Sequence, residues 1–205
     1  MDYGFKDLKD PNAYNPERSK QLLAEDGWKD TDGDGILDKD GKPLTFDFVV
    51  YNSRAELPLY AEAVQADLKK VGIDMKIKTV DYNLIDKMGQ DGDYDMLISN
   101  IVTANTGDPI WFLANYWHTN NNGSNPQNGS GYSNPQVDQL LDAAETEFDP
   151  AKRRDYAIQI QQLLMNDGAA LFLGYPKTNI VTGSYLKGAV MYPSDYYWIT
   201  NKITK

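Results

Sequence analysis

A run of aspartates and glycines near the N-terminus has the residue types and spacing of a cation-binding loop. Carboxylates stand at positions 1, 3 and 5 of the run, a glycine at position 6 and another carboxylate at position 9. The same spacing opens an EF-hand calcium loop, in which position 7 contributes its backbone carbonyl. The ligands expected on this pattern are Asp30, Asp32, Asp34, Ile36 and Asp38.

The second half of this loop departs from the calcium pattern. Gly41 stands at position 12, where a bidentate glutamate belongs, and a strand pattern follows in place of a helix. Carboxylates this close repel one another unless a cation or water lies between them. Two interpretations therefore stay open for the loop from Asp30 to Asp40. It is a weak structural Ca²⁺ site, or it is a solvated Asp/Gly hairpin that binds no ion.

A second chemically capable group surrounds a helix predicted to begin at Asp108. Trp111, Tyr116 and Trp117 stand on this helix, and a loop of Asn, Gly, Ser, Gln and Thr follows it. Aromatic walls with a few amides suit peptides or sugars. His118, the only histidine, is a candidate ligand for a metal or a metal chelate.

Each of these residues also has an ordinary structural explanation. Asp108 precedes a proline, as a helix N-cap often does. Trp111 could be part of the core, and His118 could be a surface histidine. Tyr116 and Trp117 adjoin the polar loop and are the better ligand candidates.

The residue inventory disfavours catalysis. The chain has no cysteine, so thiol chemistry and zinc–thiolate sites are excluded, and it lacks a Gly-x-Ser-x-Gly elbow and a phosphate-binding loop. We expect no catalytic residue and no required cofactor. One enzymatic alternative stays open, a secreted carbohydrate-active hydrolase fragment that uses two of the chain's many acids. Asp108 and Asp195 stand out in apolar settings, and mutation of Asp108 and Asp95 would test this alternative.

The composition of the chain limits the kinds of partner that it can bind. The chain has 205 residues, 41% of them hydrophobic, which is enough to bury a core. Its formal charge of −10 argues against nucleic acid, because phosphate binding needs clustered Lys and Arg. Part of the acidity is concentrated in residues 26–40, so the net charge is no evidence for a cationic substrate. The chain opens without a signal peptide, and we expect it to be a piece of a longer protein.

The elements that must position these residues are predicted between Leu44 and Ile101. Alternating hydrophobicity predicts strands, the first with Phe46, Phe48 and Val50 on its more buried face. Strands joined by helices of this length form parallel sheets with right-handed crossovers. The predicted order is strand 44–51, helix 57–71, strand 73–80, helix 81–88 and strand 94–101.

This order predicts an α/β fold, a three-layer α/β/α lobe with a mostly parallel sheet and helices on both faces. Ligands in such folds gather beyond the carboxyl ends of the strands. We therefore expect ligand contacts in the loops that follow the first and third strands. The candidates in those loops are Asn52, Arg54, Asn100, Val102 and Asn105.

Three further helices are predicted where Asn15, Asn134 and Asp149 each precede a proline, as N-cap and first helical residue. Residues 169–175 have the pattern of a buried strand. The side chains expected to be buried are Leu22, Leu23 and Trp28 near the first helix, Val137, Leu140, Leu141, Ala144 and Phe148 on the second, and Tyr156, Ile160, Leu163 and Leu164 on the third.

In this order the segments resemble the peptide/nickel-type (family 5) extracellular solute-binding proteins of ABC transporters. Each motif is weak alone, but together they cover nearly the whole chain. The motifs are Asn15-Pro16-Glu17, Asp32-Gly33-Asp34-Gly35, Asp40-Gly41-Lys42-Pro43-Leu44, Val71-Gly72-Ile73, Tyr94-Asp95-Met96, Asp108-Pro109, Tyr132-Ser133-Asn134-Pro135, Arg153-Arg154 and Leu186-Lys187-Gly188.

The resemblance implies a periplasmic-binding-protein-like fold of type II, peptide-binding cluster. Residues 1–190 would be the C-terminal ligand-binding lobe of a two-lobed protein, and residues 191–205 a tail that returns to the missing N-terminal lobe. The parent would be a monomer that delivers solute to an ABC permease in the membrane. It would work outside the cytoplasm, in the periplasm or at the cell surface, either secreted or lipid-anchored.

The resemblance favours oligopeptides as ligands, with nickel or a metal chelate and oligosaccharides as alternatives. In peptide-binding members an aspartate shortly before the Asp-Pro pair receives the ligand's ammonium group. Asn105 stands at that position here and lacks the charge, and Val102 replaces an aromatic residue. In nickel-binding members a histidine after this helix contacts the metal chelate, and His118 lies near that position.

Overall fold

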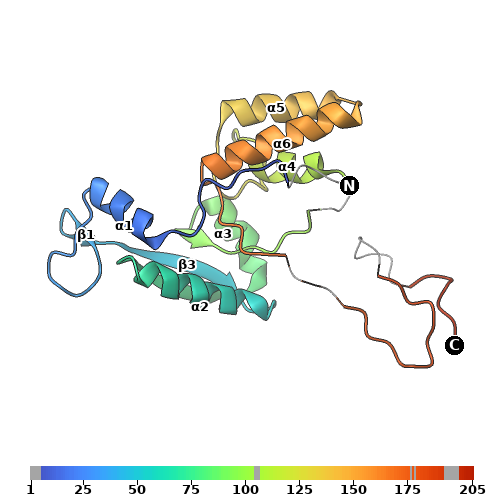
Figure 1. Cartoon of the computed structure of the whole chain (residues 1–205), viewed down its shortest axis with the longest axis horizontal. Coiled ribbons are helices and arrows are strands. Elements are labelled where there is room, and N and C mark those ends of the chain that lie inside the picture. The colour runs from blue at the N-terminus through green and yellow to red at the C-terminus, as the bar shows by residue number, and fades with distance from the viewer. Residues whose placement is uncertain (1–5, 104–106, 176, 178, 192–198) are drawn as a thin grey trace.

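Two hydrophobic cores, one in each half of the chain, organise the fold (Figure 1). The computed structural model describes residues 6–103, 107–175, 177, 179–191 and 199–205. The first core contains a parallel sheet with the helices around it, and the second contains three helices that pack on one another. None of the described helices is both long enough and apolar enough to cross a bilayer.

The sheet has three parallel strands in the order β4-β3-β5, which confirms the predicted α/β class and parallel sheet. Helix α2 runs along one side of β3, and α3 lies on the opposite side (Figure 1). Residues of both helices join the first core. The bounds are β3 Thr45–Tyr51, α2 Glu56–Lys69, β4 Asp74–Val80, the 3₁₀ helix η1 Tyr82–Leu84, α3 Ile85–Asp91 and β5 Met96–Leu97.

The central strand β3 is buried on both faces along its second half. Phe48, Val49, Val50 and Tyr51 are all at most 3% exposed. The predicted alternation of a more and a less buried face is therefore wrong here. A central strand of a parallel sheet has neighbours on both edges and cover on both faces, so successive residues in its second half are buried alike.

Gly72 shows why α2 ends where it does. Its φ of +83° lies in the left-handed region, which glycine adopts without strain. An added Cβ would lie 2.6 Å from Cγ of Leu37, so the position has no room for a side chain. The turn after α2 therefore packs against Leu37, which belongs to the loop from Asp30 to Asp40, and it leads directly into β4.

The second core is built from three helices that begin as predicted. Each starts at a proline, and the preceding Asp108, Asn134 or Asp149 accepts a hydrogen bond from a backbone N–H of the first turn. The bounds are α4 Pro109–Trp117, α5 Pro135–Thr146 and α6 Pro150–Asn166. The buried side chains are Ile110, Leu113, Trp117, Val137, Leu141, Ala144, Ala157, Ile160 and Leu164.

Two expectations about buried residues are wrong. Helix α1, Pro16–Glu25, buries none of its residues, and Leu22 is 48% exposed. Leu23 and Trp28 are only half-buried. Phe148 is 92% exposed because α5 ends before it and the chain turns away from the core. Strands β1 (Asp38–Lys39) and β2 (Lys42–Pro43) form a short antiparallel hairpin beside α1.

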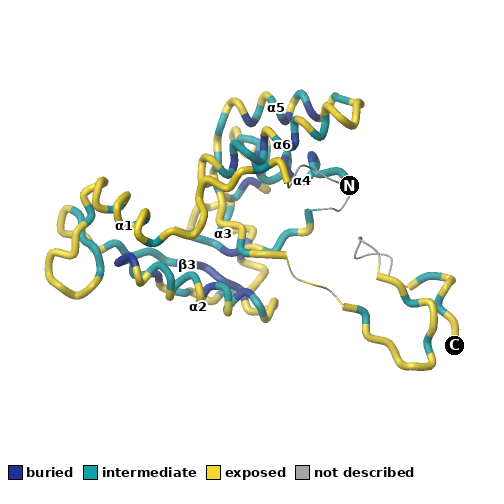
Figure 2. Tube along the Cα trace, in the orientation of Figure 1, coloured by how far each residue is buried: buried dark blue, intermediate teal, exposed yellow. Residues whose placement is uncertain are grey.

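The predicted strand 169–175 does not form. Leu171, Phe172 and Tyr175 are more than half exposed, and Leu173 alone of this segment packs against the first core. A strand needs a partner for its backbone, and the sheet ends at the two-residue strand β5. Figure 2 shows the chain from here onward as mostly exposed. Near its end, Lys187 and Thr204 form an isolated antiparallel bridge.

Candidate functional site

Tyr51 and Asn100 meet at the carboxyl edge of the sheet. The Tyr51 hydroxyl accepts a hydrogen bond from the Asn100 backbone N–H at 3.1 Å, and the Asn100 amide donates to Glu56 at 3.4 Å. Burial raises the pKa of Tyr51 above its ordinary value, and the charge of Arg54 partly opposes this rise. The hydroxyl therefore stays protonated at neutral pH, and Arg54 lies close to the same edge.

Four predicted ligand residues share this edge. Asn52 and Arg54 follow β3, while Asn100 and Val102 follow β5, and the two strands are parallel neighbours. The loops therefore leave the sheet at the same end. Asn52 and Arg54 are exposed, and Val102 is 43% exposed. Asn105 lies outside the described residues, so its predicted role stays a prediction.

Tyr82 belongs to the same edge, and the sequence reasoning missed it. Its ring lies edge-on to that of Tyr51, with centroids 5.1 Å apart, and it is 56% exposed. Burial raises the pKa of Tyr116 on α4, and interactions with Asp86 and Tyr82 raise it further. An aromatic residue directly after strand 73–80 was the available signal, but the prediction considered only the first and third strands.

Trp117 points into the protein. It is 7% exposed, belongs to the second core and lies edge-on to Tyr132, with ring centroids 5.7 Å apart. The second core therefore covers most of the Trp117 ring, and its predicted ligand role stays a prediction. Trp111 and Tyr116 are half-buried on the same helix, and their predicted ligand roles stay predictions.

Asp108 is a helix cap. One carboxylate oxygen accepts a hydrogen bond from Ile110 N–H at 3.0 Å, and the other forms an ion pair with Arg153. Of the other two acids considered for hydrolysis, Asp95 accepts a hydrogen bond from the Asp47 backbone N–H at 2.8 Å. Asp195 lies outside the described residues. Asp95 and Asp108 thus hold backbone in place, and the hydrolase alternative stays an untested prediction.

His118 is held from both sides. Its Nε2 lies 3.2 Å from an Asp142 carboxylate oxygen, and its Nδ1 lies 3.3 Å from the Thr119 carbonyl and 3.7 Å from Asp138. Burial lowers the pKa of His118, but these hydrogen bonds and charges outweigh burial and raise the pKa above 6.5. Both ring nitrogens therefore already have protein partners, which weakens the expectation that His118 holds a metal chelate.

Three of the five predicted calcium ligands converge. Single carboxylate oxygens of Asp30, Asp32 and Asp38 all lie within 4.8 Å of one another. Asp34 instead caps the loop, where it accepts a hydrogen bond from Ile36 N–H at 2.7 Å. Calcium takes six to eight oxygen ligands, so water and backbone carbonyls would have to supply the rest. Calcium binding here stays a prediction.

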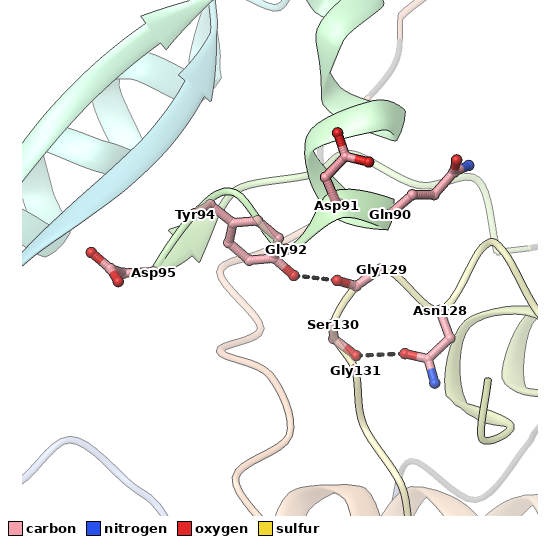
Figure 3. A pocket seen from close by; sticks show the side chains of 10 residues that line it. Gln90, Asp91, Gly92, Tyr94, Asp95, Asn128, Gly129, Ser130 and Gly131 are labelled. Atoms are coloured by element: carbon pink, nitrogen blue, oxygen red, sulfur yellow. Dashed lines mark hydrogen bonds between the residues drawn. The ribbon is translucent and has the colours of Figure 1, made fainter. Parts of the chain in front are cut away.

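Two pockets lie at the other end of β5, around Tyr94 and Asp95. One, with a volume of about 390 Å³, lies between the end of α3 and residues 128–131 (Figure 3). The other, with a volume of about 290 Å³, adjoins Asp47. In the first, Gly89 and Gly129 approach so closely that an added Cβ on Gly129 would lie 3.1 Å from Gly89 Cα. This pocket lies between α3, which belongs to the first core, and the loop that follows α4 of the second core. The predicted ligand edge, at Asn52, Arg54 and Asn100, lies at the opposite end of the strands.

Comparison with known proteins identifies the fold. The family model described as bacterial extracellular solute-binding proteins, family 5 Middle, matches residues 1–124. The chain belongs to this family. The resemblance read from the sequence motifs is thereby confirmed.

Relatives of the family 5 chain include proteins with different ligands in their names. The oligopeptide-binding protein AppA of Bacillus subtilis is 31% identical over 92% of this chain and 34% of its own length. Its structure with a nonapeptide gives a TM-score of 0.69 over 80% of this chain and 32% of AppA at 30% identity. The structure of NikA from Brucella suis with Fe(III)-EDTA gives a TM-score of 0.68 at 28% identity. The match covers 82% of this chain and 33% of that NikA chain. The structure of the mannohexaose-bound oligopeptide-binding protein of Thermotoga maritima gives a TM-score of 0.67 at 27% identity. The match covers 76% of this chain and 30% of that protein. The chain thus spans about a third of the length of these relatives.

Proposed function

We propose that this family 5 chain is the C-terminal ligand-binding lobe of a solute-binding protein that serves an ABC importer, with oligopeptides as its ligand class. The observation that carries the proposal is the match to an oligopeptide-binding protein along almost the whole chain, but along only a third of that relative. The polar edge at Asn52, Arg54 and Asn100 is the part of this lobe that a solute would touch.

The chemistry of this edge suits an extended peptide. Amide side chains both donate and accept hydrogen bonds, so Asn52 and Asn100 can pair with a peptide backbone without selecting its side chains. The Arg54 guanidinium can receive a carboxylate. No covalent bond is made or broken, and the family consists of solute-binding proteins. The isolated lobe supplies half the contacts, and closure of a second lobe would bury the ligand.

The missing partner of this lobe is the N-terminal lobe of the parent chain. Residues 1–190 would form the C-terminal lobe, and residues 191–205 would return to the other one. The exposed apolar residues Leu171, Tyr175 and Val181 support this proposal, because apolar surface of this kind in one segment fits a covered interface. The parent would act as a monomer outside the cytoplasm, secreted or lipid-anchored, beside its membrane permease.

A nickel or metal-chelate ligand is the second candidate, and the likeness to NikA favours it. His118 would be the residue involved, but Asp142 and Thr119 already occupy its ring nitrogens. An oligosaccharide is the third candidate, because one similar structure holds mannohexaose. The oligopeptide proposal has the support of the more similar relative.

Amide NMR spectra of the chain titrated with a nonapeptide, nickel–histidine and mannohexaose would test the proposal. We expect the nonapeptide to shift the signals of residues 52–54 and 100–102 and to bind in the millimolar range, as half a site should. Asn100→Ala should weaken this binding, and Asn201→Ala, at an exposed position, is the matched control. Submicromolar binding by this chain alone would contradict the half-site, and shifts with nickel–histidine or mannohexaose only would contradict the oligopeptide.

A further inference from the structure

The polar loop after α4 contains the same tripeptide twice. Asn122-Gly123-Ser124 and Asn128-Gly129-Ser130 are the two Asn-Gly pairs of the sequence. In such a pair the glycine backbone nitrogen can attack the asparagine side-chain carbonyl carbon, because glycine has no side chain to hinder the approach. Since the two tripeptides are identical and differ only in their flanking residues, we attribute a large difference in reactivity between them to the structure around them.

Asn128 is held at every atom that the reaction uses. The residue is 4% exposed. Its amide nitrogen donates to the His118 and Tyr132 carbonyls at 2.9 and 2.8 Å, and its amide oxygen accepts from the Ser130 hydroxyl at 2.9 Å (Figure 3). The attacking nitrogen, that of Gly129, donates to the Gln127 carbonyl at 2.9 Å. Attack requires the Gly129 N–H bond and the two bonds from the amide nitrogen to open, and the Ser130 bond helps to hold the amide in its present orientation.

Asn122 stands at the exposed tip of a tight turn. Asn122 and Gly123 both have positive φ, +55° and +85°. The turn is closed by one hydrogen bond from Ser124 N–H to the Asn121 carbonyl and one from Asn121 N–H to the Ser124 hydroxyl, both 3.1 Å. Within the described part of the chain, no hydrogen bond holds the Asn122 side chain or the Gly123 N–H. The turn can therefore open at a small cost in free energy, and the Gly123 nitrogen can then approach the Asn122 side-chain carbon.

We propose that Asn122 is a site of spontaneous deamidation and that the tertiary structure protects Asn128. The Gly123 nitrogen bonds to the Asn122 side-chain carbon and loses its proton, and ammonia leaves, which forms a succinimide. Water then opens the ring to aspartate or isoaspartate, so no oxidant or reductant takes part. The product carries one more negative charge than the −10 of the unmodified chain. Isoaspartate also adds a methylene to the backbone of the turn, while Asn128 keeps the loop anchored.

Incubation of the folded chain at mildly alkaline pH, followed by chymotryptic mapping and mass spectrometry, tests this proposal. A peptide from His118 to Tyr132 carries both asparagines, so fragmentation reads both rates in one sample. We expect Asn122 to convert at least about tenfold faster than Asn128, given the number of hydrogen bonds that must open at each. In urea the two rates should become equal. Equal rates in the folded chain, or faster conversion at Asn128, would overturn the proposal.

Two variants separate structural protection from intrinsic reactivity. Ser130→Ala removes one bond to Asn128 and should speed conversion of Asn128 in the folded chain relative to the same variant in urea. Asn122→Gln should abolish conversion at position 122 and leave the Asn128 rate unchanged. If Ser130→Ala leaves the ratio of folded to unfolded rates at Asn128 as it was, the hydrogen bonds described above do not protect that residue, and the proposal fails.

Discussion

Arg153 joins the ends of three helices through one side chain. Its guanidinium pairs with Asp108 at the start of α4 and donates to the carbonyls of Ala144 and Glu147 at the end of α5. The planar fork of arginine reaches several acceptors at once, and the single ammonium of lysine cannot. Arg153 therefore fixes the start of α4, next to the loop that carries Val102.

Replacing Arg153 by lysine should reduce the free energy of unfolding by about 1–3 kcal/mol, because part-buried acceptors lose their donors. Urea denaturation measures the change. Arg154→Lys is the matched control, since this neighbour pairs with Asp7 at the surface and should change stability by less than about 0.5 kcal/mol. If both variants lose the same free energy of unfolding, the Arg153 guanidinium contacts with Asp108, Ala144 and Glu147 contribute no special stability.

His118 makes stability depend on pH in one direction. Its folded-state pKa lies above 6.5, because contacts with Thr119, Asp142 and Asp138 favour the protonated ring. A raised pKa contributes stability that is complete below 6.5 and is lost as the pH rises through the folded-state value. The melting temperature of the wild type should therefore fall across that window relative to His118→Gln. Asp142→Asn should diminish this difference, and a parallel pH profile for wild type and His118→Gln would contradict the assignment.

At the scale of elements, hydrogen bonds within the loop from Asp30 to Asp40 hold its carboxylates in place. Asp30 accepts hydrogen bonds from Gly33 and Gly35 at 2.7 and 3.0 Å, and Asp38 accepts two from Thr31. These bonds explain how carboxylates of like charge stay together near α1. They also leave both interpretations of the loop, a calcium site and a solvated hairpin, consistent with its shape.

Calcium should raise the melting temperature if the loop is a site, because a ligand that binds only the folded state stabilises it. Magnesium should have a much smaller effect, since it prefers a tighter octahedron. Asp30→Asn should abolish the response, and Asp40→Asn, outside the converging carboxylates, should preserve it. If calcium does not raise the melting temperature, the loop is a solvated Asp/Gly hairpin and the calcium interpretation is wrong.

At the scale of the whole molecule, the chain has packed cores at one end and an unpacked segment at the other. Phe172 and Tyr175 are 57% and 83% exposed, whereas Tyr51 is 2% exposed. Limited chymotrypsin digestion should therefore cut first within residues 169–191. Adding the N-terminal lobe of the parent as a separate polypeptide should slow these cuts, because the proposed interface would cover them. Unchanged cutting in its presence would contradict the proposed lobe contact.

The order of helices and strands could be predicted from the sequence because the signals are local. A cap such as Asp149 bonds to a backbone N–H two residues later, and Gly72 ends α2 through its own φ. The parallel sheet followed from strands alternating with helices. The edge carrying Asn52 and Asn100 followed in turn, since parallel neighbours end on the same side.

Only the tertiary structure decided which residues are covered and which find partners. Trp117 and Phe148 have similar apolar character, yet one lies in a core and the other in solvent, because burial depends on the distant elements that pack there. Residues 169–175 have a strand pattern but pair with no strand among the residues that the structure describes. Tyr82 reaches the ligand edge through its contact with Tyr51. Non-local contacts of this kind leave no periodic trace in the sequence, so the same Asn-Gly-Ser tripeptide can be exposed in one turn and buried in the next.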